Sequence, residues 1–550
     1  MDDCSGFSRN AGHHFHPAGP SSNDSRFQRP APRPFTAQER ATTTLLFGGL
    51  TLKHEQLLKA ALESLGYRCE HLPTPDLAAL QTGKEYSNNG QCNPTYFTVG
   101  NLVKYLQQLQ ESGLSRERII DEYVFLTAGS CGPCRFGMYE AEYHNALQNA
   151  GFGGFRVLLF QQTEGYDREG REAGLQTDFD FYLSIIHSVL LGDLLNEMGY
   201  QIRPYEVTKG ATDRALERCA EILYRAIGRH HAALVTNRWT DLLESLPLLG
   251  PIVNTSRKLN RFLSSPHIIG GLEQCREILS RIEVDRTRVK PLVQITGEFW
   301  AQLTEGDGNF NMLRFLEREG AEVRINPVST WLLYVFWDIK AGYRERFGLK
   351  GNRNPLRHLY RMAIITLGER LFLRAYSRFS EALGGSIKEP VPLNDLKRLG
   401  HHYYHSRITG GEGHLEVAKS IHAVINHDCH MVLSLKPFGC MPSTQSDGVM
   451  AAVVSDYPEM IFLPIETAGE GEINAHSRVQ MALGEAYRKA QVEFEQVLQS
   501  TDLTISEIEE YLRRHPEANR AIFSPPRGSR WAGSAANFIA SISRRMKKGT

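Results

Sequence analysis

The chain has 550 residues, and Lys plus Arg and Asp plus Glu each number 62, giving a formal net charge of +0. This length predicts two or three domains. A neutral balance gives no reason to expect nucleic acid as a partner, because that binding depends on concentrated positive charge. No stretch approaches the roughly 20 apolar residues of a membrane span, and the polar start lacks the apolar core of a signal peptide.

We therefore expect a cytoplasmic protein with no membrane partner. In that compartment the nine cysteines are expected to be thiols or metal ligands rather than a disulfide framework.

The first predicted segment, residues 1–40, is rich in Pro, Ser, Asn, Gly and His. Such a composition buries too little apolar surface to order itself, so we expect a disordered tail. Residues 41–177 alternate β-branched apolar runs with helical patterns. The expected strands are "TTTLLFGGL", "RCEHLP", "EYVFLTAG" and "FRVLLFQQ". This alternation predicts an α/β lobe with a parallel sheet covered on both faces.

The pattern becomes helical over 178–290. A region at 291–400 contains the expected strands "KPLVQITGEFW" and "AEVRINPV" followed by helix, and a lobe at 401–500 contains "HMVLSLKPFGC" and "MIFLPIET". Residues 501–550 are expected to form a C-terminal helix, begun by the capping box of "TISE", and a solvated basic tail. The predicted fold class is α/β, with two or three Rossmann-like parallel-sheet lobes, helical insertions and a ligand crevice between lobes.

Four cysteines lie in unusual Gly- and Pro-rich loops. Cys131 and Cys134 lie three apart in "TAGSCGPC" after an expected strand, Cys440 lies in "KPFGCMPS" after another, and Cys92 lies in "NNGQCNPT" before a helix. Because loops at the carboxyl ends of parallel strands meet at one edge, we expect these loops to converge. Cys440 is predicted to lie close enough to Cys131 and Cys134 to bind the same metal cluster.

The chemistry of this cysteine set leaves several alternatives open. Thiolates suit zinc, cuprous copper and iron–sulfur clusters. A structural zinc ion is usually bound by two C-x-x-C pairs. This sequence has one such pair and two distant single cysteines, which favours an iron–sulfur cluster bound between domains. A thioredoxin-like redox pair would leave Cys92 and Cys440 unexplained. Zinc, thiol redox and plain structural cysteines remain the alternatives.

The other cysteines and polar loops are weaker candidates. We interpret Cys69, Cys219 and Cys275 as small buried apolar side chains. Cys429, in "NHDCHMV", has possible metal ligands beside it, but a position at the start of a strand is the plainer interpretation. The Gly-rich starts "TEGDGNFNM" and "ITGGEGHLE" are consistent with ligand binding at a helix N-terminus and with ordinary capping alike.

Four segments together resemble a known bacterial group: "TAGSCGPCRFGMYE", "ITGEFWAQLTEGDGNFNMLRFLEREGAEV", "LKPFGCMPS" and "PIETAGEGEINAHSRVQ". The group is related to 2-hydroxyacyl-CoA dehydratase, and its members are described as CoA-substrate-specific enzyme activases or activase-related proteins. The resemblance covers roughly residues 43–491. The phosphate loops and catalytic Asp of the activase proper, an ATPase of the actin/sugar-kinase type, are not found in the sequence. The chain is therefore similar to the dehydratase-subunit side of the group.

The resemblance implies an iron–sulfur redox protein, with a 4Fe-4S or double-cubane cluster held between Rossmann-like domains. It also implies electrons from an ATP-dependent activase of the actin/sugar-kinase superfamily, an acyl-CoA or other small-molecule substrate, and lyase or reductase chemistry. The sequence leaves the oligomeric state open, with a dimer as one option. The implied cluster ligands are Cys92, Cys131, Cys134 and Cys440. Candidate proton carriers are Glu298, Glu466 and His476. The alternatives are a non-catalytic electron-transfer or assembly partner and a zinc-stabilised binding protein.

Overall fold

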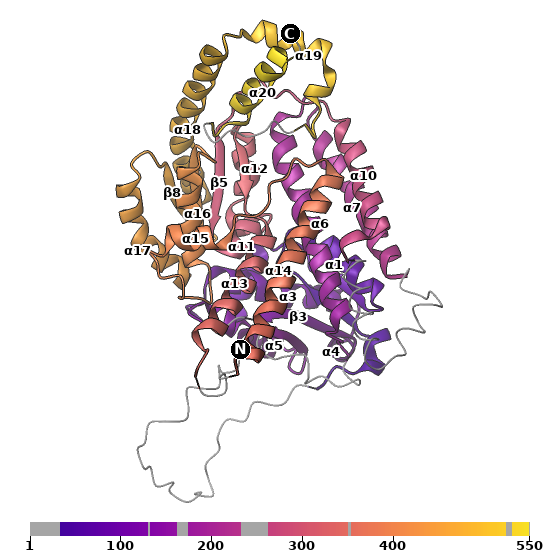
Figure 1. Ribbon diagram of the computed structural model, residues 1–550. Helices are drawn as coiled ribbons and strands as arrows, with labels where there is room; N and C mark the ends of the chain where they lie inside the picture. The colour runs from indigo at the N-terminus through magenta and orange to yellow at the C-terminus, as the bar shows by residue number, and fades with distance from the viewer. Residues whose placement is uncertain are drawn as a thin grey trace, which may run out of the picture.

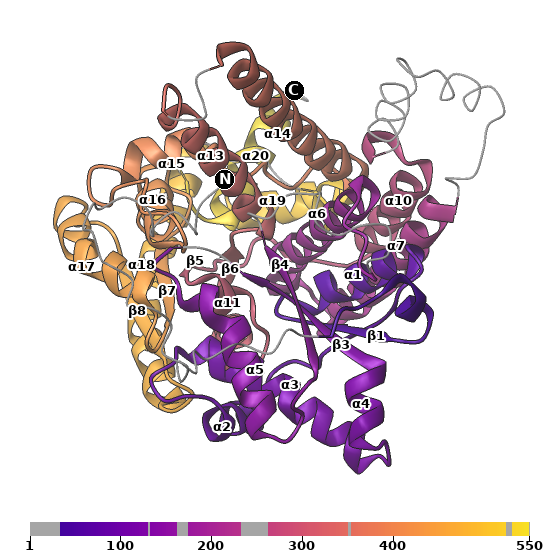
Figure 2. The same cartoon turned by 90° about the horizontal axis from the view of Figure 1, so that it is seen from below.

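The first lobe is built on a four-stranded parallel sheet with the order β2-β1-β3-β4. The computed structural model describes residues 33–129, 132–161, 174–232, 262–349, 354–523 and 531–548. The strands of this sheet are β1 (Thr44–Phe47), β2 (Arg68–His71), β3 (Tyr123–Gly129) and β4 (Arg156–Gln161). Its helices are α1 (Leu52–Ser64), α2 (Leu77–Tyr86), α3 (Asn93–Glu111), α4 (Arg116–Glu122), the 3₁₀ turn η3 (Arg135–Met138) and α5 (Tyr139–Asn149). Figures 1 and 2 show this lobe in indigo and purple.

The second lobe has a parallel sheet with the order β6-β5-β7-β8. Its strands are β5 (Leu292–Gly297), β6 (Glu322–Ile325), β7 (Met431–Pro437) and β8 (Phe462–Thr467). Every residue of β5 and β7 is buried, as expected for central strands covered on both faces. Its helices are α11 (Phe299–Leu303), η5 (Asp307–Asn309), α12 (Met312–Arg318), α16 (Gly413–Ile425), α17 (Met441–Asp456) and α18 (Glu472–Thr501).

The predicted α/β fold class is confirmed, with the two parallel sheets as two lobes. The two later strand groups, at 291–400 and 401–500, do not form separate sheets. Strand β5 pairs with β6 on one side and with β7 on the other, so both groups share one sheet.

Long helices form a layer beside the sheets. They are α6 (Phe179–Ile202), η4 (Arg203–Tyr205), α7 (Ala211–Ala232), α10 (Pro266–Ser280), α13 (Val328–Glu345), α14 (Pro355–Leu383) and α15 (Leu393–Gly400). Residues from these helices and from α1 share one hydrophobic core, so the two helical stretches of the sequence pack as one body. None of the described helices is long and apolar enough to cross a bilayer.

A buried carboxylate on α6 joins the helical layer to the first lobe. Asp193 accepts the backbone N–H groups of Val328 and Ser329, each at 2.8 Å, at the start of α13. It also accepts a hydrogen bond from the hydroxyl of Ser329 and contacts Nε2 of His54 on α1 at 3.1 Å. The side chains of Asp193 and His54 are only 2% and 1% exposed. Because a buried carboxylate needs several donors, this side chain fixes α1, α6 and α13 relative to one another.

The C-terminal segment differs from the expected solvated basic tail. After α18 come α19 (Ile505–Arg514), η6 (Pro516–Asn519) and α20 (Ser534–Lys548). Phe538, Ile539 and Ile542 of α20 are fully buried and share a core with α18 and α19. The expectation was wrong because the apolar residues of this basic segment lie on one helical face, which packs against α18 (Figure 1). The capping box that begins α19 at Thr504 is confirmed.

Residues 33–40 of the expected disordered tail are ordered. Residues 1–32 lie outside the described part, but residues 33–41 fold against the first lobe and include η2 (Ala37–Ala41). Phe35 is only 7% exposed and packs in the core beneath β1. The composition of this segment did not indicate that Phe35 is buried, because prolines and polar residues surround it.

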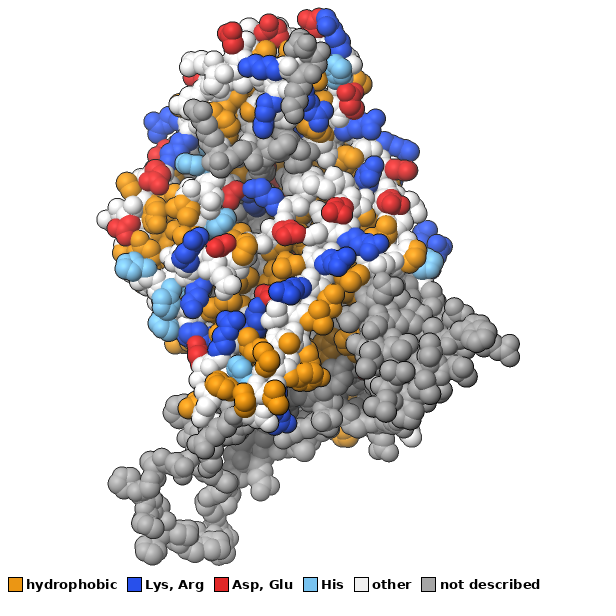
Figure 3. Space-filling model, in the orientation of Figure 1, with side chains coloured by type: hydrophobic (Ala, Val, Ile, Leu, Met, Phe, Trp, Pro, Cys, Tyr) orange, Lys and Arg blue, Asp and Glu red, His pale blue; other side chains and the backbone are white. Residues whose placement is uncertain are grey.

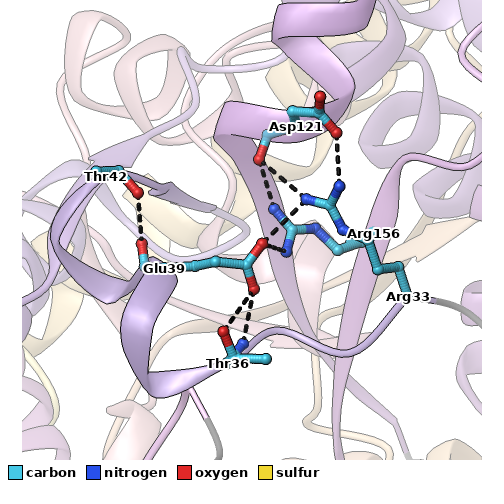
Figure 4. A network of polar contacts seen from close by, with 6 residues as sticks. All are labelled: Arg33, Thr36, Glu39, Thr42, Asp121 and Arg156. Atoms are coloured by element: carbon cyan, nitrogen blue, oxygen red, sulfur yellow. Dashed lines mark hydrogen bonds and ion pairs between the residues drawn. The ribbon is translucent and has the colours of Figure 1, made fainter.

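A charged network holds this N-terminal segment in place (Figure 4). The side chain of Arg156 on β4 is 1% exposed and donates to Glu39 Oε1 at 3.0 Å. It also donates to the carbonyl of Asp121 at 2.7 Å. Burial opposes ionisation of Glu39, but hydrogen bonds from Thr36 and the charge of Arg156 hold its pKa below the ordinary value. The ion pair therefore stabilises the folded state above the ordinary pKa of a glutamate, and this contribution is lost as pH falls through the lowered pKa.

We predict that Glu39→Ala lowers the free energy of unfolding at neutral pH by about 1–3 kcal/mol, because it leaves the buried Arg156 guanidinium without a carboxylate. Urea denaturation measures the loss. Arg33→Ala is the matched control, because Arg33 forms an ion pair with the same carboxylate but its side chain is 50% exposed. Its expected cost is below about 1 kcal/mol. Equal losses in the two variants would contradict a structural role for the buried pair.

Candidate functional site

Cys92 is the N-cap residue of α3, in the first lobe. Its sulfur lies 3.1 Å from Oγ1 of Thr95 and 3.2 Å from the hydroxyl of Tyr139 on α5. The cysteine is only 6% exposed. Asn93 beside it crosses to the second lobe, donating its backbone N–H to the carbonyl of Phe438 at 3.1 Å. Cys92 is thus held at the contact between the two lobes.

Cys134 is the N-cap residue of η3, which leads directly into α5. Its backbone N–H donates to the carbonyl of Gly410 at 2.9 Å, and its sulfur accepts the N–H of Phe136 at 3.5 Å. Gly132, with φ of +129°, packs so closely against Thr409 that an added β-carbon would lie 2.5 Å from the Thr409 carbonyl oxygen. The cysteine loop of the first lobe therefore rests on the loop before α16. Cys131 lies outside the described residues.

Cys440 follows β7 and is the N-cap residue of α17. It is only 7% exposed. A β-carbon added to Gly439 beside it would lie 3.3 Å from the α-carbon of Cys92. One added to Gly411 would lie 3.5 Å from the β-carbon of Cys134 and 2.5 Å from the ring of Pro442. The structure therefore brings together the loops of Cys92, Cys134 and Cys440, and the prediction for Cys131 stays a prediction.

Two of the thiols at this junction are buried near acidic groups. Burial, and then the nearby Glu298, raise the pKa of Cys440 well above the ordinary thiol value. Burial raises the pKa of Cys134 to about 12, with Glu298, Cys92 and Glu412 adding to the shift. Within the described residues no group of three or more His, Cys, Asp or Glu side chains is arranged to hold a metal ion.

Glu298 is the predicted proton carrier that lies at this site. It is the N-cap residue of α11 at the end of β5, and its carboxylate accepts the N–H of Ala301 at 2.8 Å. Burial raises its pKa to about 7 against the opposing effect of that hydrogen bond. The negative charge of Glu298 helps to raise the pKa values of the Cys134 and Cys440 thiols.

The other two predicted proton carriers differ in their positions. Glu466 on β8 has an exposed side chain. Thr467 beside it accepts hydrogen bonds from the Asn93 side chain at 2.7 Å and from the Phe438 N–H at 3.0 Å, so this end of β8 adjoins the Cys92 and Cys440 loops. His476 on α18 hydrogen-bonds to the carbonyl of Phe310 at 2.9 Å through Nε2 and stacks on Phe315 with 3.8 Å between ring centroids. These contacts give His476 a packing role within the second lobe.

A buried charged cluster at the start of α16 was not predicted. Glu416 accepts hydrogen bonds from Ser443 at 2.8 Å and from Ser446, both on α17. Lys419 is buried one turn further along α16, and burial lowers its pKa. Burial raises the pKa of Glu412 to about 8, and its Oε2 atom has no hydrogen-bond partner among the described residues. The only signal in the sequence is that Glu412, Glu416 and Lys419 have helical spacing beside apolar residues.

The Gly-rich segment "TEGDGNFNM" caps helices of the other lobe. Glu305 accepts the N–H of Leu52 at 2.8 Å at the start of α1, and Asp307 accepts the N–H of Leu77 at 2.9 Å at the start of α2. Carboxylates at helix N-termini satisfy free N–H groups and interact favourably with the helix dipole. This loop therefore joins the lobes. A small cavity of about 30 Å³ remains beside it, lined in part by Gly48, Glu55 and Trp300.

The remaining cysteines have structural positions. The interpretation of Cys69, Cys219 and Cys275 as buried side chains is confirmed. Cys429 lies two residues before the first residue of β7, whereas Cys440 lies three residues after the last. The seven residues of that strand span roughly 20 Å, so Cys429 lies at the opposite edge of the sheet.

Comparison of the sequence with protein-family models gives no match, and comparison with curated proteins gives none either.

We predict that Gly132→Ala destabilises the protein by about 2–4 kcal/mol, because a side chain there meets both an unfavourable φ and the Thr409 carbonyl. Gly49→Ala is the matched control. Gly49 has φ of +110°, and an added β-carbon would meet nothing within 4 Å, so only the backbone cost of about 1–2 kcal/mol is expected. Urea denaturation of both variants gives the comparison. Equal losses would show that the cysteine loop does not pack against Thr409.

Proposed function

We propose that this chain is an iron–sulfur redox protein that accepts low-potential electrons and delivers them to a substrate. One observation carries the proposal. Cys92, Cys134 and Cys440, which come from three loops and from both lobes, are N-cap residues whose loops touch one another. Cys131, three residues before Cys134, is the proposed fourth ligand.

The chemistry of the donor set supports this proposal. Without a cation the thiols of Cys134 and Cys440 have raised pKa values because they are buried near Glu298. A metal centre requires thiolates and supplies the positive charge that stabilises them. Sulfur donors are suited to iron–sulfur clusters, zinc and cuprous copper. Among these a 4Fe-4S or double-cubane cluster agrees with the group that the motifs resemble.

The residues around the cysteines have separate proposed roles. Tyr139 and Thr95 hold the sulfur of Cys92 through their hydroxyl groups. The N–H of Phe136 points to the sulfur of Cys134. Hydrogen bonds to ligand sulfurs tune the reduction potential of a cluster. A bound cluster would supply one-electron chemistry, and Glu298 remains the candidate for moving a proton beside it.

The surface of the same loops supports an electron-donor partner. Met138, Ile408, Phe438 and Met441 are large apolar residues with 43–63% exposure, and all lie within four residues of Cys134, Gly411 or Cys440. Exposed apolar groups that cluster on a surface commonly mark a protein contact. We propose that an ATP-dependent activase of the actin/sugar-kinase superfamily docks here. An acyl-CoA is the substrate class that the resemblance suggests.

A non-catalytic electron carrier is the second candidate, and the exposed apolar residues beside the cysteine loops favour it. A carrier would transfer its electron to a second protein docked on that surface and would need no substrate cavity.

We predict that anaerobically purified protein contains iron and acid-labile sulfide, and that Cys131→Ala, Cys134→Ala and Cys440→Ala each remove most of both. Loss of one thiolate leaves an iron without its ligand. Metal analysis and electron paramagnetic resonance of the reduced protein measure the outcome. Cys92→Ala is expected to have the same effect.

The controls are Cys275→Ala and Cys429→Ala, which should keep their iron because these cysteines lie outside the loop junction. A folded protein with zinc and no iron would contradict both the redox and the carrier proposals and would support a zinc-stabilised binding protein. Equal loss of iron from all cysteine variants would show that the ligands were misassigned.

A further inference from the structure

The end of the α13–α14 helix pair projects from the helical layer. We define this hairpin end by residues 343–349 and 354–367. From Asn354 to Leu371 no residue of the chain is buried, and the first buried residue of α14 is Phe372. A helix that is unburied for so many residues lacks the packing that normally stabilises it.

Apolar side chains are concentrated on this hairpin end. Leu356, Leu359, Tyr360, Ile364 and Leu367 are 49–76% exposed and recur at helical spacing along one side of α14. Phe347 and Leu349, after α13, are 46% and 59% exposed. Figure 3 shows apolar side chains in orange at the lower middle of this face, with basic side chains above and to the left of them. Contiguous apolar surface of this kind marks an interaction site.

The charged groups of the hairpin end are almost all basic. No ion pair with a described carboxylate is present for Arg344, Arg346, Arg357 or Arg361. The single acidic residue among the described residues of this end is Glu345. Its Oε1 atom forms an ion pair with Nε of Arg407 at 2.7 Å. The surface therefore combines exposed apolar groups with uncompensated positive charge.

We propose that the hairpin end binds the surface of an anionic lipid bilayer. Leucine side chains on one side of a helix can enter the boundary between headgroups and acyl chains, while flanking arginines bind lipid phosphates. This is peripheral contact and needs no spanning helix. It differs from our expectation of no membrane partner, which followed from the lack of an apolar stretch long enough to span a bilayer.

Charge and shape disfavour the other occupants. In a symmetric contact between two copies the same patch faces itself, which would place arginine against arginine with no free acid to compensate. A peptide helix binds in an apolar groove, whereas this surface is a projecting helix end (Figures 1 and 2).

The test is flotation of the full chain with vesicles of phosphatidylcholine alone or mixed with phosphatidylglycerol. Binding is expected only with phosphatidylglycerol and should weaken as salt is raised. Arg357→Gln/Arg361→Gln should lower the partition coefficient roughly thirtyfold, because each arginine near an anionic surface contributes about 1 kcal/mol. Leu356→Ser/Leu359→Ser should lower it at least as much.

The matched control is Ile473→Ser/Met481→Ser, which removes two side chains that are 84% and 80% exposed on α18; its binding should be unchanged. Circular dichroism of each variant checks that it is folded. Absence of binding to phosphatidylglycerol vesicles at low salt would overturn the proposal. So would a native dimer, seen by sedimentation, that the hairpin variants convert to monomer. Neither result depends on the metal content of the protein.

Discussion

Carboxylate side chains that accept hydrogen bonds from helix N-termini hold the two lobes and the helical layer together. Glu305 and Asp307 of the second lobe accept N–H groups at the starts of α1 and α2. Asp193 of the helical layer does the same for α13 while contacting His54 of the first lobe. Each bond satisfies N–H groups that a helix start leaves free. Together they fix the carboxyl edges of the two parallel sheets against each other.

The proposed site depends on that arrangement, because no single lobe contains it. Cys92 and Cys134 belong to the first lobe and Cys440 to the second. Glycine is required where the loops meet. An added β-carbon would lie 2.5 Å from the Thr409 carbonyl oxygen at position 132 and 3.3 Å from the Cys92 α-carbon at position 439. At position 411 it would lie 2.5 Å from the ring of Pro442. A metal centre in this position would join the lobes a second time, in addition to the capping carboxylates. The membrane surface proposed for the α13–α14 hairpin end is independent of this chemistry.

Much of the fold followed from local sequence patterns. All eight predicted strands are present, because buried parallel strands are short apolar runs bounded by turn residues. Patterns could not show that β5 pairs with both β6 and β7, since pairing depends on contacts between distant segments. Phe35 was missed because one buried aromatic residue hardly changes the composition of a polar segment.

The site was predictable only in part, for a related reason. The loops of Cys92, Cys134 and Cys440 could be placed at one edge because they flank helices and parallel strands. Glu466 was placed beside them by the same rule, but its side chain is exposed, since a position near a strand end does not determine which face a residue occupies. The cluster of Glu412, Glu416 and Lys419 was missed because charged residues on a helix are normally solvated.

The most direct measurement is anomalous X-ray diffraction at the iron absorption edge from crystals of the anaerobically prepared protein. The account predicts strong iron peaks enclosed by the sulfurs of Cys92, Cys131, Cys134 and Cys440, with the two lobes in contact around them. Iron bound elsewhere would contradict it. An anomalous signal at the loop junction at the zinc edge, without one at the iron edge, would also contradict it.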